Sequence, residues 1–304
     1  MGPVFPNPFE AEGKWFKGNL HTHTNNSDGE MTLEVAVSRY KSEGYDFLSI
    51  TDHGRLTPAQ ELSTLEFLLI PGEEVCVGAS RLGRFFHIVG LNIEEPLPIE
   101  DNNRNVTPQK ALDLISERGG ESVVAHPYWS ELSDSDIIDL EGHLGIEIYN
   151  TNCDLTIERG FSTIHWDNLL SSGKRILGLA VDDAHGRESH LLPRDWCKAW
   201  INVKAASLSA DNIMSSIREG LFYSSTGPKI TNVVVHHGEI RVETSPARSV
   251  SFVSNTALGA KRTSRGNLLG GASYKLRGGE RYVRVEVTDD RGRKAWTNPI
   301  FFKA

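Results

Sequence analysis

The sequence predicts an α/β protein with a mainly parallel sheet, followed by a smaller antiparallel β domain. Between residues 17 and 204, short apolar runs alternate with longer amphipathic stretches, which is typical of βα units around a parallel sheet. After Gly227-Pro228 the pattern changes to short alternating runs separated by Gly, Asn, Asp or Pro, which indicates antiparallel strands. We therefore expect one domain over residues 1–227 and a small β-sandwich-like domain over residues 228–304.

Seven apolar runs in the first domain are the expected strands, and the amphipathic stretches between them are the expected helices. Thr107 suits an N-cap with Pro108 at the first helical position, and Gly44 suits a C-cap. The expected strands are 18–21, 46–50, 67–70, 85–91, 122–125, 145–149 and 175–181. The expected helices are 32–43, 58–65, 107–118, 133–140, 156–172 and 209–219.

The composition excludes several classes of protein. The 304 residues include 32 Lys and Arg against 40 Asp and Glu, and the net charge of −8 argues against binding duplex nucleic acid. No apolar run approaches the roughly 18–20 residues of a membrane helix, and the N-terminus lacks the features of a signal peptide. Three cysteines without paired spacing, Cys76, Cys153 and Cys197, make a disulfide framework improbable. We expect a cytoplasmic protein with no membrane partner.

Side chains that bind metals lie at the ends of six of the seven apolar runs. Only the run that ends at Tyr149 and Asn150 lacks one. In a closed parallel barrel the C-terminal ends of the strands meet on one face, so distant residues would meet there. In the pair His21 and His23, alternation along an extended strand directs both imidazoles to one side. The six runs supply His21, His23, His53, Glu73, His87, His126, Asp183 and His185.

The joint placement of these residues is more informative than any one of them. A single histidine at a strand end is more often hydrogen-bonded or exposed than a metal ligand. Here six of 11 histidines lie at such positions, accompanied by Asp28, Glu73 and Asp183, and structural roles alone give no reason for that coincidence. Imidazoles and carboxylates without a thiolate suit zinc, manganese or iron, and a multinuclear cluster needs a bridging carboxylate.

Seven motifs in this order resemble those of the PHP (polymerase and histidinol phosphatase) family of metal-dependent phosphoesterases. They are "GNLHTHTNNSDG", "FLSITDHG", "LIPGEEV", "FHIVGLNI", "VVAHP", "GIEIYN" and "GLAVDDAH". The resemblance implies a distorted (β/α)7 TIM-like barrel, in agreement with the seven runs, and the β-rich tail resembles that of stand-alone members. It also implies two or three divalent ions, Mn, Zn or Fe, held by His21, His23, Asp28, His53, Glu73, His87, His126, Asp183 and His185.

The resemblance further implies how the ligands divide among three ions. One ion would be held by His21, His23, Glu73 and Asp183. Glu73 would bridge to a second ion, held together with His87 and His126, while the third would take Asp28, His53 and His185.

The expected reaction is phosphoester hydrolysis by a hydroxide held between the two metals that share Glu73. Glu73, Asp183 and His185 are the candidate catalytic residues, with Asp183 or His185 passing the proton to the leaving group. Asp52 and Asp182, next to expected ligands, are candidates to orient an imidazole. The candidate substrate contacts are Arg187, Arg55 and Asn150.

Three functions remain open on the sequence alone. The first is hydrolysis of a small phosphorylated metabolite or nucleotide. The second is amidohydrolase-type hydrolysis of a C–N bond in the same site. The third is a non-catalytic metal-binding scaffold with a β binding module, which has no need of a complete ligand set. The sequence does not indicate an oligomeric state.

Overall fold

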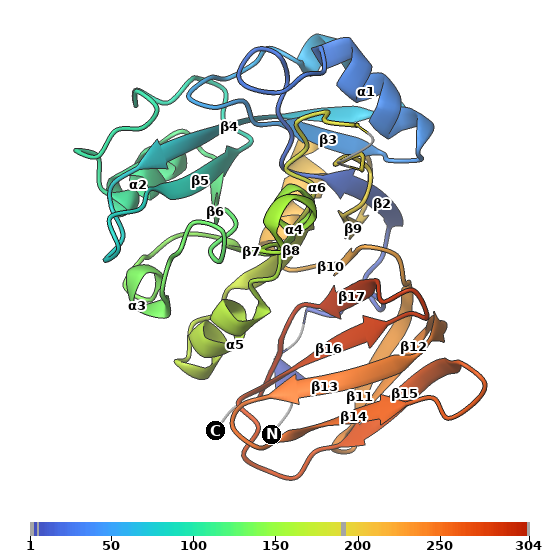
Figure 1. Ribbon diagram of the computed structural model, residues 1–304. Coiled ribbons are helices and arrows are strands. Elements are labelled where there is room, and N and C mark those ends of the chain that lie inside the picture. The colour runs from blue at the N-terminus through green and yellow to red at the C-terminus, as the bar shows by residue number, and fades with distance from the viewer. Residues whose placement is uncertain (1–2, 5, 190–192, 303–304) are drawn as a thin grey trace.

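The computed structural model describes residues 3–4, 6–189 and 193–302, which form two parts that share one large sheet (Figure 1). Within these residues the large sheet has 15 strands, and a second sheet of three strands lies in the C-terminal part. In the first part the strands follow the order β2-β3-β4-β5-β6-β7-β8. The protein is therefore mixed α/β, as the sequence predicts, but this run of described strands does not close into a barrel.

All seven expected strands form in the first part. Two strands that the sequence analysis did not predict, β9 (Trp200–Ala205) and β10 (Phe222–Ser225), continue the sheet antiparallel beyond β2. The seven are β2 (Lys14–Asn19), β3 (Phe47–Ile50), β4 (Leu68–Val77), β5 (Phe86–Leu91), β6 (Glu121–Val124), β7 (Gly145–Asn150) and β8 (Leu177–Val181).

The expectation of a parallel sheet throughout the first part is wrong at β5. This strand runs antiparallel to both β4 and β6, whereas β2-β3-β4 and β6-β7-β8 are parallel. Strand β4 also continues well past residue 70, where the expected strand ended, and pairs with β5 up to Val77. As a result, the ligands on β4 and β5 lie within strands rather than beyond their C-terminal ends.

The helices α1 (Leu33–Ser42) and α2 (Pro108–Glu117) both have side-chain N-caps, of which that of Thr107 was predicted. The Thr32 hydroxyl accepts from the Val35 amide and that of Thr107 from the Lys110 amide. Gly44 follows α1 with φ +73°, a conformation that glycine adopts without strain. Within the described residues no helix is long and apolar enough to cross a membrane.

Three predicted helices differ from the structure. Residues 58–65 form only a short 3-10 turn (Gln60–Leu62), because Thr64 and Phe67 pair with each other and turn the chain into β4. The predicted helix 133–140 is the single turn α3 (Asp134–Ile137). The expected 156–172 helix is two helices, α4 (Thr151–Ile157) and α5 (Thr163–Ser171), whereas α6 (Ala210–Arg218) matches its prediction closely.

The C-terminal part is antiparallel, as its sequence pattern indicates, and has an apolar core of its own. Strand β1 (Pro3–Val4) pairs with its last strand, so the start of the chain lies against this part (Figure 1). The domain boundary after residue 227 stays a prediction. The strands are β11 (Ile230–His236), β12 (Glu239–Ala247), β13 (Ser249–Ser254), β14 (Gly259–Thr263), β15 (Leu269–Lys275), β16 (Tyr282–Thr288), β17 (Lys294–Thr297) and β18 (Ile300–Phe302).

A buried ion pair and a strand pair join the two parts. Strand β10 pairs with β17, which makes the large sheet continuous. Arg284 of β16 is 3% exposed and donates two hydrogen bonds of 2.7 Å to the carboxylate of Asp167 on α5. This bidentate geometry is the strong form of an arginine–carboxylate contact.

We predict that Arg284→Ala lowers the free energy of unfolding by about 3 kcal/mol, because it leaves the Asp167 carboxylate without its buried partner. Urea unfolding at pH 7 measures the loss. Arg281→Ala is the matched control, since Arg281 is exposed and its guanidinium donates to a backbone carbonyl. Equal stability of the two variants would show that the ion pair does not hold the parts together.

His143, between α3 and β7, gives a pH-dependent contribution to stability. Burial, with the charge of Lys174 nearby, lowers the pKa of His143 to about 4. The unfolded chain binds this proton at about pH 6.5, so stability is lost as the pH falls below that value. We expect His143→Phe to remove about 2 kcal/mol of the loss between pH 7 and pH 5. Urea unfolding of both proteins at the two pH values measures the difference, and an unchanged pH dependence would contradict it.

Candidate metal centre

The carboxylate of Glu74 lies at the centre of a cluster of imidazoles. Glu74 is 1% exposed, and its Oε2 lies 3.0 Å from His21 Nε2 and 3.1 Å from His23 Nε2. Its Oε1 lies 2.9 Å from His87 Nδ1 and 3.4 Å from His126 Nε2. One carboxylate therefore faces two groups of imidazoles, one on each oxygen, which is the arrangement of a bridging ligand.

The first donor set is His21, His23, Glu74 and Asp183, and all four side chains are buried. His21 and His23 leave the end of β2 on the same side, and their Nε2 atoms lie 3.1 Å apart. Asp183 Oδ1, just beyond β8, lies 3.3 Å from His21 Nε2 and 3.1 Å from His23 Nε2. Donor atoms bound to one zinc-like ion at about 2.0–2.2 Å lie at separations of this size.

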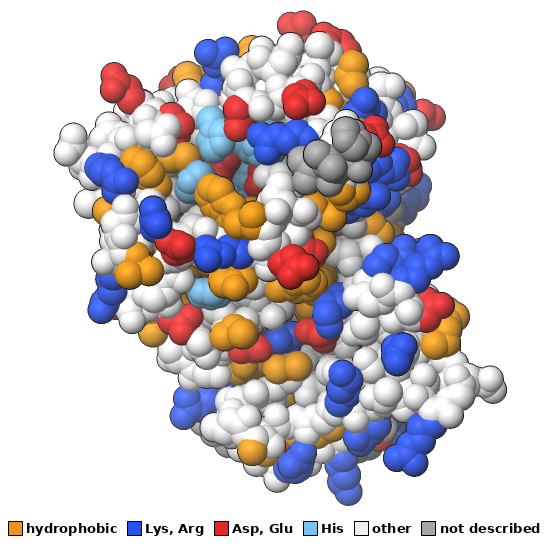
Figure 2. Space-filling view, viewed as in Figure 1, with side chains coloured by type: hydrophobic (Ala, Val, Ile, Leu, Met, Phe, Trp, Pro, Cys, Tyr) orange, Lys and Arg blue, Asp and Glu red, His pale blue; other side chains and the backbone are white. Residues whose placement is uncertain are grey.

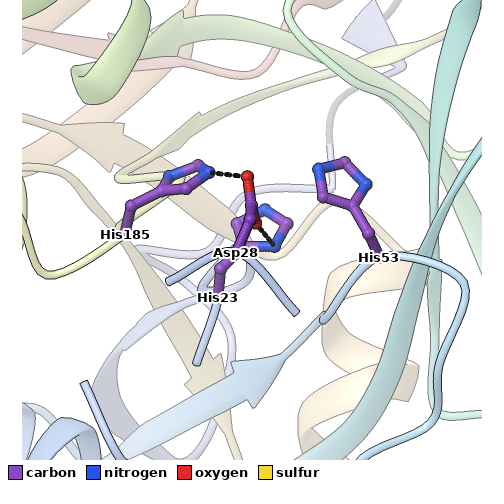
Figure 3. A group of neighbouring side chains, drawn as sticks. All are labelled: His23, Asp28, His53 and His185. Atoms are coloured by element: carbon purple, nitrogen blue, oxygen red, sulfur yellow. Dashed lines mark ion pairs between the residues drawn. The ribbon is translucent and has the colours of Figure 1, made fainter. Parts of the chain in front are cut away.

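Two more donor sets adjoin the first. Glu74, His87 and His126 form the second. The third is His23, Asp28, His53 and His185, in which the imidazoles of His53 and His185 flank Asp28 (Figure 3). Asp28 Oδ2 lies 3.2 Å from His185 Nε2, and Asp28 Oδ1 lies 3.6 Å from His23 Nδ1. The structure thus brings together eight of the nine predicted ligands.

The ninth predicted ligand, Glu73, is wrong, and Glu74 takes its place. The sequence analysis ended the strand at residue 70, whereas β4 continues to Val77 and alternates its side chains between two faces. Glu74 therefore faces the cluster, and Glu73 points to the opposite side, where its Oε2 accepts from the Leu97 amide. Burial raises the pKa of Glu73 to about 7. Because Glu73 lies away from the donor sets, the structure does not support the catalytic role expected of it.

A second layer of polar groups holds the ligands in place. Glu147 Oε1 lies 2.6 Å from His21 Nδ1, which leaves the Nε2 of that ring free to face the first donor set. Glu147 Oε2 accepts from the His126 amide and from Asn150 Nδ2, and Asn150 Nδ2 also lies 3.1 Å from Asp183 Oδ2. Asn150 is fully buried, so it positions a ligand and is not the substrate contact that we expected.

Among the described residues neither Asp52 nor Asp182 has a hydrogen bond to an imidazole, contrary to expectation; both accept from backbone amides instead. Asp52 accepts from the Thr24 amide and from the hydroxyls of Thr24 and Ser27, which fixes the loop between His23 and Asp28. Asp182 is fully buried and accepts from three successive amides, those of Cys197, Lys198 and Ala199. Asp52 thus holds the loop between His23 and Asp28, and Asp182 holds the backbone of residues 197–199.

Carboxylates and imidazoles of the cluster shift one another's pKa values. Burial opposes ionisation of Glu74, but His53 and His21 hold the pKa of its carboxyl well below the usual range. Burial alone lowers the pKa of His23, yet hydrogen bonds with Asp183 and Glu74 raise it to about 9. Because a bound cation must displace protons from such imidazoles, metal affinity should increase with pH.

Two ligands have an unusual backbone conformation. His126 has φ +27° and Asp183 has φ +52°, in the left-handed region that residues other than glycine rarely adopt. Each costs on the order of 1–3 kcal/mol and persists only where the surroundings impose it. For His126, the surroundings include the bond of its amide to Glu147 and the contact of its Nδ1 with the Ser130 hydroxyl at 2.9 Å. The fold thus holds these two side chains in position at a cost in stability.

The donor sets open into a cavity of about 160 Å³, visible in Figure 2 as a hollow with histidines at its base. Arg187 lines this cavity, as expected of a substrate contact. Arg55 is exposed and is not part of the lining, so the structure does not support its predicted role. A second hollow of about 330 Å³ adjoins the first and shares His87 and Trp129 with it.

Sequence reasoning missed four residues of this centre. Glu147 lies inside the one run that seemed to lack a metal-competent side chain. Its position between Ile146 and Ile148 on a strand, where side chains alternate, could have indicated that it faces the opposite side from them. Glu74 and Cys76 could be placed only with the full length of β4, which continues to Val77. Trp129, edge-on to His87 and His126 with ring centres 5.5 and 5.0 Å away, had no sequence signal beyond its proximity to His126.

We predict that Glu74→Gln removes at least one metal ion per chain and weakens metal binding by more than about 100-fold, because it takes the shared carboxylate from two donor sets. Glu73→Gln is the matched control and should bind metal as the wild type does. Elemental analysis after dialysis against a weak chelator measures the metal content. If Glu73→Gln lost metal and Glu74→Gln kept it, our placement of the bridge would be wrong.

One solved structure resembles nearly the whole chain. It is a two-domain protein from Bacteroides vulgatus that contains a predicted PHP-like metal-dependent phosphoesterase. The TM-score is 0.52 at 15% sequence identity, and the match covers 91% of each chain. At this identity the likeness shows a shared fold. No family model matches the chain.

Three curated proteins are similar to parts of the chain. A protein of Methanocaldococcus jannaschii described as uncharacterized is 28% identical over 152 residues, which are 44% of this chain and 81% of that protein. The phosphoribosyl 1,2-cyclic phosphate 1,2-diphosphodiesterase of Eggerthella lenta is 36% identical over 26% of this chain and 32% of its own length. The 5'-3' exoribonuclease Rnm of Escherichia coli K12 is 39% identical over 33% of this chain and 36% of its own length.

This chain spans about a third of the length of the two named enzymes. Both act on phosphodiester bonds by name, and the structural neighbour is described as a PHP-like phosphoesterase. The motifs, the fold and these relatives agree. The resemblance of the motifs to those of PHP-like metal-dependent phosphoesterases is therefore confirmed.

Proposed function

We propose that this chain is a metal-dependent phosphoesterase that hydrolyses a small phosphorylated substrate with two or three divalent ions. The observation that carries the proposal is the position of Glu74, whose two oxygens face two separate donor sets. Imidazole and carboxylate donors of this kind suit manganese, zinc or iron. When bound, such ions activate a water molecule and neutralise the oxygens of a phosphoryl group.

The residues of the chain orient the substrate around these sets. Arg187 lies on the segment that follows Asp183 and His185 and lines the cavity, so its guanidinium suits a non-bridging phosphoryl oxygen. His185 Nδ1 contacts the Asp183 carbonyl at 2.9 Å, which leaves Nε2 facing Asp28. When the third donor set holds no ion, this nitrogen can pass a proton to the leaving oxygen. Asp183 serves mainly as a ligand in this proposal.

The hollow beside the cavity suits the remainder of the ester. Trp129 and Ile157 are 39% and 54% exposed there, and Phe85 adds a third apolar side chain. Arg84 at its edge is paired with Glu131 at 2.6 Å, so the hollow has little net charge to attract a second phosphate. This arrangement favours a leaving group with an apolar or aromatic surface.

The comparisons do not support the exclusion of nucleic acid as a substrate. One relative is named an exoribonuclease. The net charge of −8 still disfavours duplex binding, and a terminal phosphate of a single strand is compatible with the cavity. We propose a cytoplasmic location, which the three free cysteines support.

Two finer points belong to this proposal. Amidohydrolase-type chemistry in the same site remains the alternative reaction. The description of the first part as a distorted (β/α)7 barrel also remains a proposal, supported by the parallel bridge between Thr22 and Ala184, which joins the segments after β2 and β8.

The test is metal-dependent hydrolysis of p-nitrophenyl phosphate, its bis ester and a panel of nucleotides by the manganese-loaded protein. We expect Arg187→Gln to raise KM by about 10-fold or more with a smaller change in kcat, because a charged hydrogen bond to phosphate is lost. Arg55→Gln, at an exposed arginine outside the cavity, is the matched control and should leave both constants unchanged. If none of these substrates released product in a metal-dependent manner, the proposed reaction would be wrong.

A further inference from the structure

Cys76 lies beside the donor sets, although its spacing in the sequence does not indicate a metal-binding thiol. It follows Glu74 by two positions on β4 and so faces the same side of the sheet. Its side chain is 2% exposed. Its Sγ lies 3.7 Å from His53 Nδ1 and 3.4 and 3.5 Å from the two ring nitrogens of His87.

These separations match the edges of a tetrahedral metal site. With metal–sulfur and metal–nitrogen bonds of about 2.3 and 2.0–2.1 Å, the sulfur and nitrogen atoms of a tetrahedral zinc site lie about 3.6 Å apart. His87 offers one nitrogen to an ion, and the distances from Cys76 Sγ to His87 Nε2, 3.5 Å, and to His53 Nδ1, 3.7 Å, fall on either side of that value. The donor atoms of His53, Cys76 and His87 all lie within 4.8 Å of one another.

We propose that His53, Cys76 and His87 form an additional site for a thiophilic divalent cation such as zinc, cobalt or cadmium. Three protein donors leave a fourth position open to solvent, and the partial exposure of the two imidazoles, 22% for His53 and 16% for His87, gives access from the cavity. On binding, a metal–sulfur bond replaces the S–H bond and the proton passes to solvent.

Occupation of this site competes with the donor sets of the proposed catalytic centre. His53 also belongs to the set with Asp28, and His87 to the set with Glu74 and His126. A thiophilic cation that takes both imidazoles thus removes one donor from each of two neighbouring sets. Hard ions such as manganese prefer oxygen donors and should not compete for the sulfur. The inhibitory consequence rests on the proposed function, whereas the binding itself does not.

Neither other cysteine has this environment. Cys197 Sγ lies 3.9 Å from the Arg39 carbonyl, and among the described residues neither Cys197 nor Cys153 belongs to a group of metal-competent side chains. Cys197→Ser is therefore a control that removes a thiol from the chain without touching the donor sets.

The experiment is a cobalt titration of the metal-free protein, followed by absorbance. We expect the wild type and Cys197→Ser to develop a thiolate-to-cobalt charge-transfer band in the near ultraviolet, together with visible bands from the other donor sets. Cys76→Ser should lose the near-ultraviolet band and keep the visible ones. A wild-type protein with visible bands and no charge-transfer band overturns the proposal, whether or not any variant folds, and leaves the proposed function untouched.

Inhibition supplies a second readout. We expect cadmium to inhibit manganese-dependent hydrolysis by the wild type at a concentration at least 10-fold lower than for Cys76→Ser, with Cys197→Ser behaving as the wild type. Equal sensitivity of Cys76→Ser and the wild type would overturn the competition between sites. Absence of hydrolysis with a normal charge-transfer band would count against the proposed function alone.

Discussion

The metal centre depends on one buried carboxylate that cannot be satisfied without positive charge around it. Glu74 is almost fully buried, and an isolated carboxylate there would carry a large desolvation cost. Among the described residues its oxygens pair with imidazoles, which come from the segments after β2, β3 and β6 and from β5. Because Glu74 belongs to two donor sets, a shift of β4 would remove a donor from both of them.

Glu147 extends this constraint to the far side of the cluster. Its carboxylate contacts the back of His21, the amide of His126 and the side chain of Asn150, which in turn reaches Asp183. Glu147 thus contacts the segments of His21 and His126 directly, and Asn150 of its own strand links it to the segment of Asp183. A single group of this kind fixes the direction of the donors without occupying a position that a metal needs.

The sequence predicted most of the strands and most of the residues that meet in the donor sets, because both depend on local patterns. Apolar runs located seven strands, and polar residues after them located His21, His23, His126, Asp183 and His185. The error at Glu73 came from the length of one strand, since a shift of one residue moves a side chain to the opposite face. The direction of β5 and the roles of Asn150 and Asp52 depend on pairing and hydrogen bonds between distant segments, which no local pattern encodes.

The C-terminal part completes the edge of the sheet that carries Asp183. The ladder of parallel strands ends at β8, and an unpaired strand edge in a buried position leaves amides and carbonyls unsatisfied. The Ser224 hydroxyl of β10 accepts from the Ala180 amide and donates to the Gly178 carbonyl, and the Asn298 side chain accepts from the Gly178 amide.

On the other side of β8, α5 packs Trp166 so close to Gly178 that a side chain there would collide with the indole. The same helix holds Asp167, the partner of Arg284. Ser224 of β10 and Asn298 of the C-terminal part thus satisfy one side of β8, and the ion pair of Arg284 anchors the helix that packs against the other. Asp183, with its strained conformation, lies immediately beyond β8, so these contacts hold the strand from which it leaves, although among the described residues the C-terminal part supplies no member of the donor sets.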